Sequence, residues 1–174
     1  MFSSATRALL AAGLSALALS ACNGAAAPDE TSEAERAAAF FMESNARAEG
    51  VHVLESGVQY KVVRSGDPSG PQPDSNDLVR VNYEGALTDG TVFDSSYRRG
   101  VPAAMPLDRL IPAWQEAIPH MHVGDEWLIY VPPEQGYGAE GSPPEIPPHS
   151  VLVFRVELLG VAEVPGGEAA SARA

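Results

Sequence analysis

The chain has 174 residues, which is enough for one domain of ordinary size with extensions at its ends. It carries 23 acidic and 11 basic side chains, a formal net charge of −12, and this excess of negative charge argues against nucleic acid as a partner. Its single cysteine excludes a disulfide bond within the chain.

Residues 1–21 have the features of a secretory signal peptide. Arg7 supplies a positive charge, a largely apolar run over residues 9–19 follows, and small residues come next. The apolar run is much shorter than the roughly 20 residues that a membrane-spanning helix needs. We therefore expect residues 1–21 to be removed on export.

The segment Leu19-Ser20-Ala21-Cys22 resembles a bacterial lipobox, in which the cysteine is lipidated and becomes the new N-terminus. The alternative is an unpaired thiol near an ordinary cleavage site. Several acyl chains at Cys22 would anchor the protein stably to a membrane, with its folded part facing the periplasm. Asn23 after the cysteine indicates the outer membrane, by resemblance to enterobacterial sorting rules. The sequence thus predicts a lipid-anchored protein of the bacterial cell envelope.

A tether and a helix precede the main domain. Residues 22–30 are small and flexible in composition, whereas residues 31–50 combine N-capping residues, early glutamates and an alanine-rich run that ends at a glycine. The helix carries an apolar cluster, Phe40-Phe41-Met42, that must be covered. The cluster either packs on its own domain or forms a short surface for dimerisation or for contact with client proteins.

The first half of the domain follows the pattern of an antiparallel meander. Alternation of apolar and polar side chains from Val58 to Val62 predicts a strand with one solvent-facing side. Residues 67–77 are rich in proline, glycine and serine and are expected to form a loop. Residues 79–83 place apolar side chains on one face of a second strand, and the turn at residues 88–91 leads into the next one.

The second half contains a short helix and two strands. Pro112 is well placed at the first position of a helix that runs to about Ile118 and buries Trp114. Residues 126–131 are too apolar for a half-exposed strand and are expected to form a buried one. Over residues 152–158, apolar side chains stand at every second position, which predicts the last strand.

These elements predict an α+β fold in which a curved antiparallel β-sheet wraps over one short α-helix, with an additional N-terminal helix. The main domain is expected over residues 51–162. Residues 163–174 have nothing to bury and are expected to be a disordered tail.

Several motifs resemble those of the FKBP-type peptidyl-prolyl cis-trans isomerases, and the resemblance covers about Gly57 to Gly160. In chain order the motifs are Val-Asn-Tyr-Glu-Gly (81–85), Asp-Gly-Thr-Val-Phe-Asp-Ser-Ser (89–96), Leu-Ile-Pro-Ala-Trp (110–114), Tyr-Gly (137–138), Ile-Pro-Pro-His (146–149) and Leu-Val-Phe-Arg-Val-Glu-Leu (152–158). The lipobox and the short helix look like those of small bacterial lipoprotein members related to the macrophage infectivity potentiators. The N-terminal segment lacks the length of the helical dimerisation module of those proteins.

The resemblance implies an apolar pocket with two groups of residues. The expected catalytic residues are Tyr83, Phe93, Asp94, Trp114, Tyr137 and Phe154. The expected substrate-binding residues are Met105, Leu110, Ile111 and Ile146. Trp114 would form the floor, and Asp94 would orient Tyr83 or polarise the rotating carbonyl region. The Tyr137 hydroxyl and the Ile111 N–H would donate to substrate carbonyls.

Four positions depart from the pattern of the family. Met105 replaces an aromatic wall residue, Ala103 stands where another aromatic is found in human-type members, Ala113 replaces a glycine and Ser142 occupies a rim position often held by histidine. None of these changes removes the pocket floor. The family resemblance implies macrolides such as rapamycin as possible ligands, but these substitutions make that implication weaker than isomerase activity.

The implied activity is rotation of X-Pro bonds in exported, proline-containing polypeptides. The alternatives are a non-catalytic periplasmic chaperone or binding module with the same fold, and a structural lipoprotein of the envelope. Rotation of a prolyl bond requires no proton transfer and no cofactor. His120 and His122 lack further suitable ligands nearby, so no metal site is expected. His149 is expected to satisfy local backbone groups at a turn.

Overall fold

The computed structural model describes residues 30–166. The predicted signal peptide, the lipidation site Cys22 and nearly all of the tether lie outside this range, as do residues 167–174 of the predicted tail. Among the described residues, no helix combines the length and the apolar character that crossing a membrane would require.

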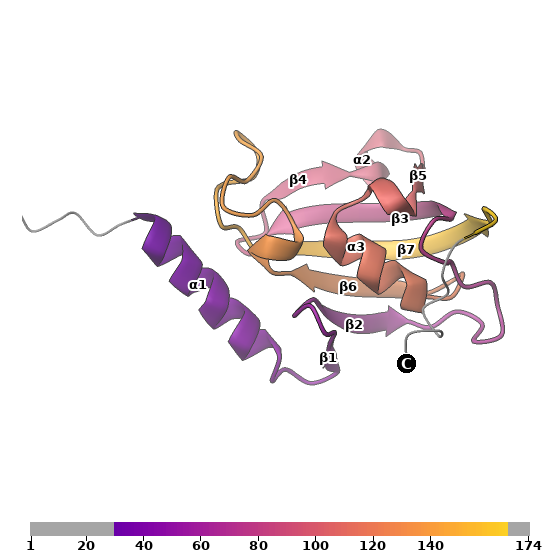
Figure 1. The fold of residues 1–174 in the computed structure, drawn as a ribbon, viewed down its shortest axis with the longest axis horizontal. Coiled ribbons are helices and arrows are strands. Elements are labelled where there is room, and N and C mark those ends of the chain that lie inside the picture. The colour runs from indigo at the N-terminus through magenta and orange to yellow at the C-terminus, as the bar shows by residue number, and fades with distance from the viewer. Residues whose placement is uncertain (1–29, 167–174) are drawn as a thin grey trace, which may run out of the picture.

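Within residues 30–166, seven antiparallel strands form a single curved sheet (Figure 1). Its strand order is β1-β2-β6-β7-β3-β4, and β5 pairs with β3 beside β4. The strands are β1 (Val51–Val53), β2 (Gln59–Arg64), β3 (Leu78–Leu87), β4 (Val92–Ser95), β5 (Ala103–Pro106), β6 (Glu126–Val131) and β7 (Leu152–Ala162). Short β4 and β5 share one edge of the long strand β3, while β7 occupies its other edge.

In the described part of the chain, three α-helices accompany the sheet, and one of them covers it. They are α1 (Glu30–Asn45), α2 (Ser96–Arg99) and α3 (Pro112–Ala117). Single 3₁₀ turns are η1 (Leu107–Arg109), η2 (Ile118–His120) and η3 (Pro133–Gln135). Helix α3 lies across the sheet in Figure 1, whereas α1 lies beyond the sheet end. The predicted α+β class, with a curved sheet over one short helix, is confirmed.

The core lies between α3 and the concave side of the sheet. Alternate residues of β3 and β7 point into it, which explains the period of two in both segments. Pro112 occupies the first turn of α3, where no backbone N–H is needed, and the helix buries Trp114. Ile118, which directly follows α3 and begins η2, is also buried. The core residues are Val58, Val79, Val81, Tyr83, Leu107, Ala113, Trp114, Ala117, Ile118, Met121, Trp127, Ile129, Val131, Ile146, Leu152, Phe154, Val156 and Leu158.

The predicted alternation from Val58 to Val62 is wrong. Gln59 is only 3% exposed, while Val62 and the rest of the strand beyond it are exposed. Two causes act here: helix α1 covers Gln59, and the pairing of β2 with β6 shifts register after Val62. The short elements β1, α2 and β5 carry too few residues for a periodic pattern, and the sequence did not predict them.

Helix α1 is attached to the domain through the Gln59 side chain. The Gln59 amide nitrogen donates to the Met42 carbonyl at 2.8 Å, and its oxygen accepts from the Asn45 amide at 2.8 Å. The Met42 carbonyl also accepts from the Ala46 N–H, so the buried Gln59 amide adds a second hydrogen bond there and links α1 to β2. The helix ends at Asn45, five residues before the glycine that was expected to end it.

The apolar cluster of α1 is divided between two environments. The Phe41 ring lies 6.3 Å from the Tyr130 ring of β6, and Met42 is half-buried. Phe40 points away from the domain and is 73% exposed. Packing on its own domain therefore accounts for Phe41 and Met42 but not for Phe40.

Replacing Gln59 by leucine is expected to lower the free energy of unfolding by about 1–3 kcal/mol, because the Asn45 amide loses its acceptor and the Met42 carbonyl loses one of its two donors. Urea unfolding measures this loss, and amide hydrogen exchange should show faster opening of α1. Exposed Gln72 provides the control substitution, Gln72→Leu. Equal unfolding free energies for the two variants would show that Gln59 does not hold the helix.

Candidate active site

A pocket of about 230 Å³ opens beside the N-terminus of α3. It is lined by Tyr83, Phe93, Asp94, Met105, Arg109, Leu110, Ile111, Trp114, Tyr137 and Phe154. These side chains come from β3, β4, β5, η1, α3, β7 and the segment after η3, so distant parts of the sequence meet here. Nine of the ten residues expected at the site are among them.

Aromatic rings form the floor and walls of the pocket. The Trp114 ring meets the rings of Tyr83 and Phe154 edge-on, with centroids 5.3 Å away in both cases and interplanar angles of 88° and 86°. Phe93 meets Phe154 in the same manner at 5.7 Å. Trp114 is 3% exposed, and its surface borders the cavity. Such perpendicular contacts fix ring orientations, so the cavity has a defined shape.

Gly85 of β3 makes room for two of these walls. A Cβ atom on Gly85 would lie 2.7 Å from atoms of both the Phe93 and Phe154 rings. The two phenylalanines pack against this part of the strand because it bears no side chain.

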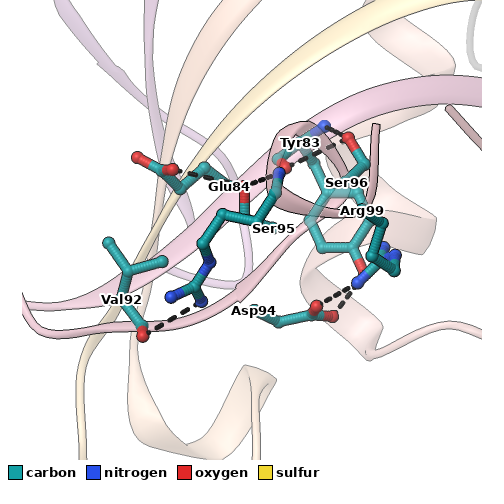
Figure 2. A network of polar contacts seen from close by, with 8 residues as sticks. Tyr83, Glu84, Val92, Asp94, Ser95, Ser96 and Arg99 are labelled. Carbon is teal, nitrogen blue, oxygen red and sulfur yellow. Dashed lines mark hydrogen bonds and ion pairs between the residues drawn. The ribbon is translucent and has the colours of Figure 1, made fainter. Parts of the chain in front are cut away.

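A polar network occupies one side of the pocket (Figure 2). The Tyr83 hydroxyl donates to Asp94 and accepts from the Arg99 guanidinium at 2.9 Å, while Arg99 also forms an ion pair with Asp94. The Arg99 guanidinium carbon lies 5.3 Å from the centre of the Tyr83 ring. Asp94 therefore orients the Tyr83 side chain, which is one of the two roles expected for it. Arg99 is a third member of this network that the sequence did not predict.

Helix α2 brings Arg99 to this network. The Ser95 hydroxyl caps the helix by accepting from the Arg98 N–H, and Gly100 ends it with a φ of 73°. The Ser96 hydroxyl accepts from the Tyr83 N–H at 2.8 Å and so joins α2 to β3. A helix of only four residues thus sets the position of the guanidinium.

The network determines the charge states of its members. Partial burial opposes ionisation of Asp94, but hydrogen bonds from Tyr83 and Arg99 outweigh it, so the pKa of Asp94 lies below its usual value. Burial raises the pKa of Tyr83, and its bond to Asp94 raises it further. At neutral pH, Asp94 is an anion and Tyr83 is a neutral phenol. Neither is suited to exchange protons near pH 7.

Three hydrogen-bond donors at the pocket have no acceptor among the described residues: the hydroxyl of Tyr137, which is 42% exposed, the backbone N–H of Ile111, and the buried indole N–H of Trp114. Ile111 directly precedes α3, so its N–H lies outside the helical hydrogen bonds. The first two are the donors that the sequence analysis expected to meet substrate carbonyls.

Two expected placements differ in the structure. Ile146 does not line the pocket but is 3% exposed and packs in the core, where its backbone pairs with Ser142. The His149 imidazole lies 3.4 Å from the Glu35 carboxylate of α1 rather than on nearby backbone groups. Both differences arise because residues 142–149 fold back on themselves and against α1, which no local pattern indicates.

No cluster of three or more potential ligand side chains within residues 30–166 is arranged to hold a metal ion. His120 and His122 border a separate hollow with Asp125. The Asp125 carboxylate there accepts from the backbone N–H groups of Gly66 and His122, so it stabilises the local backbone conformation.

Replacing Asp94 by asparagine is expected to destabilise the protein at pH 7 but not in acid. Because the pKa of Asp94 is lowered by folding, its stabilising contribution is present above the unfolded value of about 3.9 and is lost as the pH falls through the folded value. Urea unfolding from pH 7 to pH 3 should therefore show the gap between parent and Asp94→Asn closing below about pH 4. A gap that is the same at every pH would contradict this role of the carboxylate.

Comparison with known proteins agrees with this geometry. Residues 70–159 match the family model of the FKBP-type peptidyl-prolyl cis-trans isomerases, and residues 11–62 match that of the domain amino-terminal to these isomerases. The peptidyl-prolyl cis-trans isomerase Mip of Coxiella burnetii is 50% identical over 121 residues, covering 70% of this chain and 52% of that protein. The outer membrane protein MIP of Legionella longbeachae is 39% identical over 121 residues, covering 70% and 51%.

Solved structures include a peptidyl-prolyl cis-trans isomerase from Pseudomonas syringae pv. tomato, which is similar with a TM-score of 0.72 and 37% identity. The similarity covers 80% of this chain and all of that one. The chain spans about half the length of the curated relatives it matches. From the family model, which covers more than half of its residues, the chain belongs to the family of FKBP-type peptidyl-prolyl cis-trans isomerases.

Proposed function

We propose that the chain accelerates cis-trans rotation of X-Pro bonds in polypeptides. The observation that carries this proposal is an apolar pocket, floored by Trp114, at which the Tyr137 hydroxyl and the Ile111 N–H lack acceptors among the described residues. The size and lining of the pocket suit a proline ring, and its rim suits the carbonyls on either side of that ring.

The chemistry of the reaction explains why such a pocket suffices. Rotation about a peptide bond is slow because the C–N bond must lose its partial double-bond character, at a cost of ~18–20 kcal/mol. In the twisted state the nitrogen regains its lone pair and the carbonyl loses charge. A water-poor pocket therefore favours the twisted amide over the planar, more dipolar one. No covalent bond to the enzyme forms, and no proton is transferred.

Each part of the pocket has a task in this mechanism. Trp114 lies under the proline ring, and the walls of Phe93 and Phe154 exclude water from it. The Tyr137 hydroxyl and the Ile111 N–H hold the substrate carbonyls while the prolyl bond turns. Asp94 orients the Tyr83 side chain, and Arg99 stabilises that arrangement.

The energies involved are modest. An acceleration of about four decades requires only ~5–6 kcal/mol of preferential stabilisation of the twisted state. A net hydrogen bond contributes about 0.5–1.5 kcal/mol, so two donors supply about 1–3 kcal/mol and cannot provide the whole acceleration. Dehydration and positioning by the aromatic walls must supply the rest.

Magnetisation-transfer measurements on an Ala-Leu-Pro-Phe peptide test the proposal. The parent at substoichiometric concentration should speed exchange, and Phe93→Ala and Tyr137→Phe should reduce the effect. Tyr97→Phe, a change at an exposed tyrosine outside the pocket, is the control. Exchange no faster than in buffer, together with measurable peptide binding, would instead support a non-catalytic chaperone or binding module.

The protein is further proposed to act in the bacterial envelope, anchored by lipid at Cys22 and facing the periplasm. The lipobox-like segment supports this location, as does the name of the Legionella longbeachae relative, outer membrane protein MIP. Its substrates would then be exported polypeptides, and macrolides such as rapamycin are candidate ligands of the pocket. Labelling with palmitate in cells that produce the parent or Cys22→Ala tests the anchor. Equal labelling of both would exclude lipidation at this cysteine.

A further inference from the structure

Arg109 is a pocket residue that none of the family motifs includes. It ends the 3₁₀ turn η1 and lines the pocket beside Leu110 and Ile111. The nearest motif, Leu-Ile-Pro-Ala-Trp, begins one residue later, so the motifs give no indication of Arg109. Its long exposed side chain stands at the rim, where parts of a substrate next to the proline would lie.

The backbone that carries Arg109 is held in place on both sides. Leu107 is fully buried, and its N–H donates to the Asp77 carbonyl at 2.9 Å. On the other side, the Gln115 amide donates to the Leu110 carbonyl at 2.7 Å. Arg109 therefore extends from a fixed point, although its side chain is free to adapt.

The charge of Arg109 is not neutralised in the structure. Over residues 30–166, its guanidinium makes neither an ion pair nor a hydrogen bond. Among the described residues that line the pocket, Asp94 is the one carboxylate, and it is already paired with Arg99. Within residues 30–166, Arg109 is thus a cation at the rim without an ion-pair partner, on a chain whose net charge is −12.

We propose that Arg109 is a specificity-determining residue that favours prolyl substrates with a carboxylate next to the proline. A guanidinium pairs with a carboxylate through parallel hydrogen bonds, which gives directional recognition as well as attraction. The net negative charge of the protein repels acidic substrate segments from the rest of its surface. Attraction of a substrate carboxylate is therefore confined to the pocket rim, where Arg109 lies. This inference rests on the proposed isomerase activity.

The effect is measurable but limited in size, because the side chain is exposed to solvent. Exposed ion pairs change a binding equilibrium by about 1.5-fold to 5-fold at low ionic strength. Salt screens such pairs, so the preference should shrink as the ionic strength rises from about 0.02 M to 0.5 M.

The test compares kcat/KM for paired peptides that differ only in Glu or Gln, either before the proline (Ala-Glu-Pro-Phe, Ala-Gln-Pro-Phe) or after it (Ala-Leu-Pro-Glu, Ala-Leu-Pro-Gln). In the parent the Glu:Gln ratio should exceed that of Arg109→Gln by about twofold to fivefold for at least one pair. Arg109→Glu should favour the Gln peptide. Arg80→Gln removes the same charge from an exposed position on β3 outside the pocket and should keep the parental ratio.

The outcomes separate this inference from the activity itself. Acceleration of Ala-Leu-Pro-Phe with equal Glu:Gln ratios in the parent and both Arg109 variants would overturn the role of Arg109 while leaving the isomerase intact. A ratio that falls equally in Arg80→Gln would assign the preference to net charge and would also overturn it. Absence of acceleration for every peptide would overturn both proposals together.

Discussion

Replacing Trp114 by alanine is expected to lower the free energy of unfolding by about 3–5 kcal/mol and to abolish acceleration of prolyl rotation. The indole is buried, and it contacts the rings of Tyr83 and Phe154 on two sides. Its removal therefore leaves a void in the core and takes away the surface on which the proline ring would lie. Urea unfolding and peptide exchange measure the two effects separately.

The second tryptophan of the chain provides the control for this experiment. Trp127 is also almost fully buried, and its ring stacks on that of Tyr60 with centroids 4.1 Å apart, away from the pocket. Trp127→Ala should lose stability but keep its turnover per folded molecule. Trp114→Phe, which retains an aromatic floor, should keep part of the activity. If Trp114→Ala stays folded and turns over peptide as the parent does, the indole is not the pocket floor that the mechanism requires.

Gly85→Ala is expected to damage the same pocket by adding one methyl group. The new carbon would lie 2.7 Å from both the Phe93 and Phe154 rings, closer than non-bonded carbons approach, so both walls must shift. Overpacking of this kind costs about 1–3 kcal/mol of stability. Because the displaced rings are the walls themselves, kcat/KM should fall more steeply than stability does. Thermal or urea unfolding and peptide exchange together reveal this difference.

Gly160→Ala is the matched substitution for this prediction. Gly160 lies in β7 of the same sheet, and a Cβ there would meet no atom within 4 Å. It therefore adds the same methyl group without crowding. The prediction would be contradicted if Gly85→Ala had the activity of the parent and the stability of Gly160→Ala. The Phe93 and Phe154 rings would then accommodate the methyl group without any effect on the pocket.

Patterns of apolar side chains and proline over short segments correctly predicted individual strands and helices. The period of two in residues 152–158 and the proline at the start of α3 each correspond to an observed element, because each reflects which side of that element is buried. Val62 did not follow its pattern, since the environment of β2 depends on α1 and on a shift in pairing with β6. Those contacts join residues far apart in the chain.

The sequence predicted the pocket residues that belong to the family motifs and form its walls. Ile146 was placed at the rim because its motif resembles that of the family, yet the fold of residues 142–149 turns it into the core. Arg99 and Arg109 were not predicted, because neither belongs to a family motif and a single arginine carries no sequence pattern that indicates a place at the pocket. Only the three-dimensional arrangement shows that Arg99 is paired with Asp94, whereas Arg109 lies at the pocket rim and forms no ion pair within residues 30–166.

The central claim is that this pocket speeds rotation of the prolyl bond by dehydration and positioning, without moving a proton. The most direct test is kcat/KM for an Ala-Leu-Pro-Phe peptide in H₂O and in D₂O. Since no group in the pocket acts as a general acid or base, the ratio should be about 1. A ratio of about 2 or more would mean that a proton moves in the rate-limiting step and would contradict the mechanism.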